Sequence, residues 1–458
     1  MYNRSILRLE PRSWCAIARM VVLAGILSAS FSAMAGASQT PSGHPSGDAA
    51  SHQRPEASDR PVSEFHLSRE KYEKAVAYSR AGYILYFVSV VWEILVLLIL
   101  LSTAAVAKWR ASAERMVRHW VLQGLIFVPG LFVAMAVAQL PIRVYWHALS
   151  LRYQQSIQGW GSWMWDWTKG ELISIVFGLV AVLILFAVIR KAPQRWWLYF
   201  WFVSIPLVLI MVLITPLVLD PMFHKFVPLE QTNPQLVESI EKLTERAGEP
   251  IPRNRMFLMV ASEKTNQINA YVTGIGASKR VVVWDNTIKK MAPEEVLFIV
   301  GHEMGHYVLG HVAKGIAFGV AGILVALFVA FQALQWVLRR WGTTWGVRTQ
   351  EDWAALAVLW LIGSIIGFMA EPIGNGFSRR VEHDADVYGL EVIHGIVPNA
   401  QETAEHSFQV MGELDLADPD PPRMITVWLY SHPPLADRLK FAHEYDPWDK
   451  GEKPKYVK

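Results

Sequence analysis

Long apolar stretches separated by short polar segments make up most of this chain. Six of them have close to the ~20 residues that an α-helix needs to cross the hydrocarbon core of a bilayer. They cover about 82–107, 121–140, 171–189, 197–219, 314–337 and 353–372. The pattern predicts a mainly α, polytopic membrane protein with about six transmembrane helices.

A polar block between the fourth and fifth apolar stretches has the periodicity of a folded domain. Apolar residues fall on one helix face over 233–247, and Gly248 is a helix-stop signal. The β-rich runs 255–260 and 280–284 predict a small strand pair. Pro293 and the two glutamates after it are helix-start signals. We therefore expect the strand pair to pack on one helix over 293–311.

The ends of the chain have a different composition. Several arginines precede an apolar run that ends near Ala35, which predicts a signal peptide over 1–35, with an uncleaved signal anchor as the alternative. Residues 36–65, rich in Ser, Pro and Gly, predict a disordered linker. The charged tail 446–458 is expected to be loose.

These patterns together predict the domain organisation. It is a membrane domain with four spans (66–219), the first part of a soluble domain (220–312), two further spans (313–376) and the second part of the soluble domain (377–445). Helices are expected in that second part at 377–393, 424–430 and 436–444.

Positive charges follow the first, third and fifth spans, which are alternate loops. These residues are Lys108, Arg110, Arg115 and Arg118; Arg190, Lys191 and Arg195; and Arg339, Arg340 and Arg348. The positive-inside rule places all three loops in the cytoplasm. Both parts of the soluble domain are then expected on the opposite, extracytoplasmic side of what we predict to be a bacterial inner membrane.

Composition supports the membrane assignment and narrows the chemistry. The chain is 52% hydrophobic and 18% charged, against about 25% charged in a soluble protein. Its net charge of +3 is too small to predict a nucleic-acid partner. The single cysteine, Cys15, excludes an intramolecular disulfide and a thiolate-rich zinc site. Any zinc must therefore be bound by histidines and carboxylates.

The expected helix over 293–311 carries such ligands. His302 and His306 are four residues apart, so both rings lie on one helix face and can share one zinc ion. Glu303 lies where its carboxylate can reach a water molecule held at the metal. An amphipathic helix with two surface histidines would show the same spacing, so a third ligand is needed. In a continuous helix His311 faces away from the pair, which excludes it.

A second acidic pair follows the last span. Glu382 and Asp386 are also four residues apart on an expected helix. A solvated helix face is the usual explanation for such a pair, but the apolar residues that follow favour a packed helix. A zinc site with two histidines accepts a glutamate as its third protein ligand.

At this point the chain resembles the integral-membrane zinc endopeptidases typified by the type I CAAX prenyl protease. Five segments in the family's order carry the resemblance: 220–226 (DPMFHKF), 269–271 (NAY), 302–306 (HEMGH), 382–386 (EHDAD) and 431–434 (SHPP) with Arg438. The resemblance implies a zincin-like α/β catalytic domain with a small sheet.

The resemblance also implies the roles of single residues. His302, His306 and Glu382 would bind one Zn²⁺ per chain, and Glu303 would be the general base that acts on a zinc-activated water. Asp386 would orient a ligand imidazole. Three more residues, Asn269, His432 and Arg438, match positions that line the substrate cleft, with His432 also a catalytic candidate. A His-Pro-Pro turn and a helix arginine could instead lock the fold.

The expected substrate is a peptide or protein. The resemblance to prenyl proteases implies that it can be membrane-associated or lipidated. We expect it to bind by strand addition near 280–284. Two alternatives stay open: an envelope or membrane-protein quality-control protease without prenyl specificity, and an inactive zinc-stabilised membrane scaffold. A transporter is disfavoured, because the chain lacks internal repeats.

Overall fold

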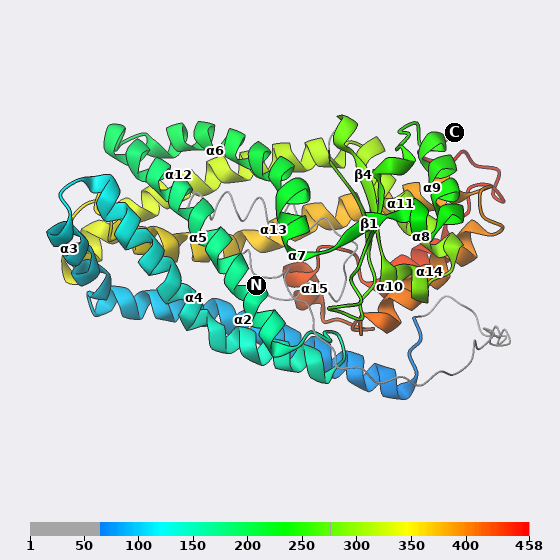
Figure 1. The fold of residues 1–458 in the computed structure, drawn as a ribbon, viewed down its shortest axis with the longest axis horizontal. Helices are drawn as coiled ribbons and strands as arrows, with labels where there is room; N and C mark the ends of the chain where they lie inside the picture. Colours follow the sequence, from blue (N-terminus) through cyan, green and yellow to red (C-terminus); the bar gives the residue numbers. More distant parts are fainter. Residues whose placement is uncertain (1–64, 275, 458) are drawn as a thin grey trace.

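The computed structural model describes residues 65–274 and 276–457. The signal segment expected over 1–35 and nearly all of the linker expected over 36–65 lie outside the described residues. Long helices run along the longest axis of the molecule, and a small sheet with shorter helices lies at one end (Figure 1). The helix α3 lies at the opposite end.

Within the described residues, six helices are long and apolar enough to cross a membrane, which confirms the expected polytopic helical fold. They are α2 (Arg69–Ser102), α4 (Trp120–Arg152), α5 (Trp160–Lys191), α6 with its continuation (Trp196–Phe223), α12 (His311–Trp345) and α13 (Ala355–Ile393). The longest has 39 residues, or about 58 Å at 1.5 Å per residue. Since the hydrocarbon core is about 30 Å thick, these helices extend beyond the membrane.

The first helix shows where hydropathy misplaced a boundary. The apolar stretch predicted over 82–107 belongs to α2, which begins at Arg69 and ends at Ser102. A left-handed residue, Ala104 (φ 51°), then starts α3 (Ala105–Met116). Tyr78 in the early part of α2 packs into the core of the soluble domain. Hydropathy marks only the lipid-facing part of such a helix.

One helix, α13, joins two segments that the sequence separates into a span (353–372) and a soluble helix (377–393). Its residues 355–362 pack in the core of the membrane helices. Its residues near 390 pack in the core of the soluble domain. The expected domain boundary at 376 therefore falls inside a continuous helix, and the soluble domain is built on the extension of a span.

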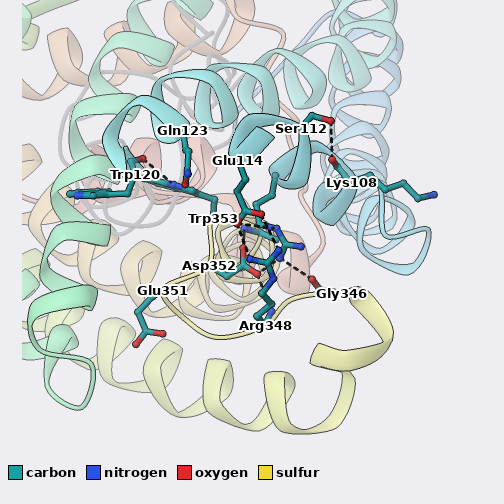
Figure 2. A network of polar contacts seen from close by, with 12 residues as sticks. Lys108, Ser112, Glu114, Trp120, Gln123, Gly346, Arg348, Glu351, Asp352 and Trp353 are labelled. Atoms are coloured by element: carbon teal, nitrogen blue, oxygen red, sulfur yellow. Dashed lines mark hydrogen bonds and ion pairs between the residues drawn. The ribbon is translucent and has the colours of Figure 1, made fainter. Parts of the chain in front are cut away.

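Polar contacts fasten the segment between α12 and α13 to α3 (Figure 2), the helix at the far end of the molecule (Figure 1). Arg110 on α3 is buried against Asp352 and also donates to the Gly346 carbonyl oxygen, at 3.1 Å. Arg348 pairs with both oxygens of Glu114, at 2.9 Å each. Arg190 donates to the Glu351 carbonyl oxygen at 2.7 Å, so residues from all three positively charged loops meet at this end.

The soluble domain contains a four-stranded sheet in the order β1-β2-β4-β3. Its strands are β1 (Phe226–Pro228), β2 (Met256–Met259), β3 (Ala270–Thr273) and β4 (Arg280–Trp284). The expected strand pair is β2 and β4, which are parallel with Met256 opposite Val281. The other two strands pair antiparallel on either side. The sequence pattern did not predict these two strands, which have three and four residues.

Helices surround this sheet. They are α7 (Asp220–Phe223), α8 (Leu229–Thr232), α9 (Pro234–Arg246), α10 (Asp285–Lys290), α11 (Pro293–Val308), α14 (Ala400–Leu414), α15 (Arg423–Leu429) and α16 (Leu435–Glu444). The amphipathic helix expected over 233–247 is α9, and Gly248 after it has a φ of 72°. No pattern predicted α14, whose Phe408 packs edge-on to Phe298 of α11.

The tail expected to be loose makes specific contacts. Backbone N–H groups of Tyr456 and Val457 donate to the carboxylate of Glu391 at 2.7 and 2.8 Å. Trp448 stacks on His394 with ring centroids 3.6 Å apart. The buried Glu391 thus attaches the tail to the end of α13.

Candidate metal centre

The site forms where α11 crosses the soluble end of α13. Glycines on both helices allow the close approach. A Cβ atom added to Gly389 would lie 2.9 Å from the backbone nitrogen of His302, and one added to Gly301 would lie 2.8 Å from Cγ1 of Val392. The first of these neighbours is backbone, which cannot move aside as a flexible side chain can. The crossing therefore depends on the missing side chain at 389.

Gly389→Ala is expected to separate the two helices and to destabilise the protein by about 1–3 kcal/mol, as overpacking does. We expect a lower melting temperature in detergent and a loss of bound metal. Gly367→Ala, on the same helix with no atom within 4 Å of the added carbon, is the control and should retain both. Unchanged metal binding in the Gly389 variant would contradict this account of the crossing.

Three candidate ligands meet at this crossing, and each is buried. Nε2 of His302 lies 3.3 Å from Nε2 of His306 and 3.3 Å from Oε2 of Glu382. Nε2 of His306 lies 3.7 Å from the same oxygen. Ligands at 2.0–2.2 Å from a tetrahedral ion are about 3.3–3.6 Å apart. The triangle therefore has the size that a zinc ion requires.

Glu382 gives a second test of fit. It is fully buried, and neither of its carboxylate oxygens accepts a hydrogen bond from the described residues. A buried carboxylate without such partners is costly unless a cation neutralises it. The donor set of two imidazoles and one carboxylate is one that zinc accepts in sites with an open fourth position.

The His302 ring is held from behind by an ion pair. Its Nδ1 lies 2.8 Å from Oδ1 of Asp386. Arg438 donates to both oxygens of that carboxylate, at 2.9 and 2.5 Å, and its guanidinium lies 4.4 Å from the ring centroid of Phe408. Burial, the largest single effect, disfavours a charged imidazole, but the carboxylates of Asp386 and Glu382 together outweigh it and raise the pKa of His302.

Arg438, expected in the substrate cleft, is therefore buried behind the site, with 3% of its surface exposed. Its guanidinium contacts Asp386, which favours the fold-locking alternative that the sequence left open.

His432 lies on the opposite side of the glutamate. Its Nε2 is 3.0 Å from Oε2 of Glu382, and its Nδ1 is 3.1 Å from Oγ of Ser431. The preceding Tyr430 meets the hydroxyl of Tyr83 of α2 at 2.6 Å. Tyr83 in turn donates to Asp418 at 3.0 Å. The long extension of α2 thus supports the loop that carries His432, a role that no local sequence signal revealed.

Glu303 and Asn269 complete the expected set. Glu303 follows His302 on α11 and is 3% exposed. Asn269 immediately precedes β3; its backbone N–H donates to Thr287 at 2.8 Å, and its buried Oδ1 has no hydrogen-bond partner among the described residues. The hydroxyl of Tyr307, one residue after His306, donates to the Gly274 carbonyl oxygen at 2.8 Å. This contact ties the end of β3 to α11.

The expected orientation of His311 was wrong, although the residue is not among the candidate ligands. Helix α11 ends at Val308 rather than continuing to 311, and Gly310 adopts a φ of 66° before α12 begins. This turn brings Nδ1 of His311 to 3.2 Å from Nδ1 of His306. The residue lies outside the ligand triangle, but it contacts one of the ligands.

Comparisons with known proteins show which proteins the chain is similar to. Residues 230–446 match peptidase family M48, and residues 52–225 match the CAAX prenyl protease N-terminal domain with five membrane helices. The chain is 34% identical over 374 residues to the uncharacterized metalloprotease YhfN of Bacillus subtilis, covering 81% of this chain and 86% of the relative. It is 26% identical over 341 residues to CAAX prenyl protease 1 of Saccharomyces cerevisiae, covering 70% of this chain and 72% of the relative.

A solved structure shares the fold. The crystal structure of S. mikatae Ste24p matches with a TM-score of 0.73 and 22% sequence identity, over 84% of this chain and 91% of that chain.

Proposed function

Because this chain belongs to peptidase family M48 and is a multi-pass membrane metalloprotease, we propose that it is a zinc endopeptidase whose metal is held by His302, His306 and Glu382. The single observation that carries the proposal is the buried triangle of three ligand atoms, 3.3 to 3.7 Å apart. An inactive scaffold would not need a further buried carboxylate next to a ligand, and the buried Glu303 directly follows His302 on α11.

A bound zinc ion supplies Lewis acidity, which activates water and polarises a peptide carbonyl. Glu303 is positioned to take the proton of the attacking water as general base. The same carboxyl group then returns that proton to the nitrogen of the leaving amine.

Two other side chains act on a ligand and on the substrate. Asp386 accepts the Nδ1 proton of His302, which leaves the Nε2 lone pair directed at the metal position. His432 lies beside the carboxylate ligand, where its Nε2–H can donate to the carbonyl oxygen as negative charge develops on that oxygen.

The strand expected to receive the peptide is not an edge strand. The 280–284 segment is β4, an internal strand with β2 on one side and β3 on the other, so its backbone groups are already engaged. The terminal strand β3, which follows Asn269 and is tied to α11 through Tyr307, has its outer edge open within the described sheet. We place the substrate peptide on that edge, by strand addition.

The substrate class has two candidates. Relatives named CAAX prenyl protease favour a lipidated or membrane-associated protein. The positive loops favour an extracytoplasmic site, which suits a quality-control protease for membrane proteins. With either substrate class, the partners of the protein are the lipid bilayer and a peptide.

A peptide panel tests the function. Purified full-length protein should cleave unmodified or farnesylated peptides, lose cleavage in a chelator and regain it with Zn²⁺. Faster cleavage of the farnesylated peptide would favour prenyl specificity. Equal cleavage rates for the two peptides would favour the quality-control role. Methylation of backbone nitrogens near the cleaved bond should reduce cleavage by blocking strand addition. No cleavage of any peptide by zinc-loaded protein would refute the enzyme assignment.

A further inference from the structure

The turn between α11 and α12 brings a third imidazole to the candidate metal centre. N–H groups of Leu309 and Gly310 close the end of α11 onto the carbonyl oxygens of Gly305 and Tyr307, at 2.9 and 3.0 Å. In an uninterrupted helix, His311 would point about 140° away from His306. The left-handed Gly310 changes the chain direction, so the ring of His311 returns and is 6% exposed. The two ring centroids are 5.2 Å apart, with planes inclined by 68°.

The atoms in contact determine which hydrogens the two rings carry. The Nε2 atom of His306 faces the other two ligand atoms, so this nitrogen must present a lone pair to a metal. A neutral imidazole then carries its proton on Nδ1. That Nδ1–H points to Nδ1 of His311 at 3.2 Å. His311 must therefore accept there and carry its own proton on Nε2.

We propose that His311 is a positioning residue that accepts the Nδ1 proton of His306 and holds this ligand ring in its metal-binding orientation. The inference rests on the proposed metal site. It gives the two ligand histidines different supports: His302 is held by the anionic Asp386, and His306 by a neutral imidazole. Because Glu303, Glu382 and Asp386 are already buried around the site, a neutral acceptor orients His306 without adding a fourth buried carboxylate.

Substitutions at this position separate the acceptor role from simple packing. His311→Leu removes the acceptor and keeps an apolar side chain. His311→Asn places an amide oxygen near the position of Nδ1, where it can accept from His306. His443→Leu is the control. The ring of His443 on α16 contacts Glu405 on α14, at 3.1 Å, and contacts none of the candidate ligands.

The test measures metal binding by full-length protein in detergent, with Co²⁺ as the probe. We expect H311L to shift the visible absorption of bound cobalt and to weaken metal affinity about 10–100-fold. H311N should stay within a few-fold of the unsubstituted protein, and H443L should not differ from it. The melting temperature of each variant after metal removal by a chelator shows whether it folds. Should H311L not fold, H311Q replaces it, because its amide reaches the Nε2 position instead.

Two results would overturn the assignment. One is the same cobalt spectrum and affinity in H311L as in the unsubstituted protein, and the other is equal weakening in H311L and H311N. Either would leave the proposed function intact, since cobalt would still bind. Failure of the unsubstituted protein to bind cobalt or zinc would instead overturn both proposals.

Discussion

Replacing Glu303 with glutamine is expected to lower kcat by about 10²–10⁴-fold, the range that a general acid–base group contributes. Glutamine keeps the size of the side chain but cannot take a proton from water. The ligand triangle does not include this carboxylate, so the metal content should be unchanged. The measurement is kcat on a cleaved peptide together with metal analysis of the same preparation.

Glu295 offers a control on the same helix. It is also buried, and its carboxylate accepts from the backbone N–H of Ala292 at 3.0 Å and contacts His406. Glu295→Gln should cost some stability but retain cleavage, because this group lies at the start of α11. If Glu303→Gln were as active as Glu295→Gln, the proposed mechanism would be wrong.

Replacing Arg438 with methionine is expected to destabilise the protein by about 3–5 kcal/mol. Methionine fills much of the volume but leaves Asp386 buried without its bidentate cation. The His302 ring should lose its fixed orientation as well, so metal affinity is expected to fall. Chemical denaturation in detergent and competition with a chelator measure the two effects.

A second arginine in the chain makes the comparison quantitative. Arg348 also pairs with both oxygens of a carboxylate, Glu114, but 59% of its side chain is exposed. Water screens such a pair, so Arg348→Met should cost no more than about 1 kcal/mol. The double variant Arg438→Met with Asp386→Asn removes the buried charge and should recover part of the stability. Equal losses from the two arginine substitutions would show that burial of the first pair is unimportant.

Local periodicity in the sequence was sufficient to predict many of the helices of this protein. The spacing of His302, Glu303 and His306 predicts two ligands and a base on one helix, because the helix geometry is the same wherever the helix lies. Hydropathy likewise predicts the six spans, since lipid contact acts on each segment separately. The likeness to the CAAX prenyl protease family, carried by short motifs, predicted the recruitment of Glu382 and Asp386 from across two spans.

Other features depend on contacts that no segment contains by itself. The turn at Gly310 reversed the expectation for His311, because one left-handed residue redirects every atom after it. The strand β4 is internal and β3 is one of the two edge strands of the described sheet, since strand order follows from the packing of four distant segments. Arg438 contacts Asp386 behind the site because α13 and α16 meet only in the folded chain.

The sequence by itself thus determined the membrane helices and placed two candidate ligands on one helix, because these follow from side-chain chemistry and a fixed helical repeat. The third candidate ligand, Glu382, came from the likeness to the family. Tertiary structure alone decided the size of the triangle of candidate ligands, the side chains that contact each of them and the order of the strands in the sheet. These depend on how closely α11 and α13 approach at Gly301 and Gly389, and that distance is set by packing between residues far apart in the chain.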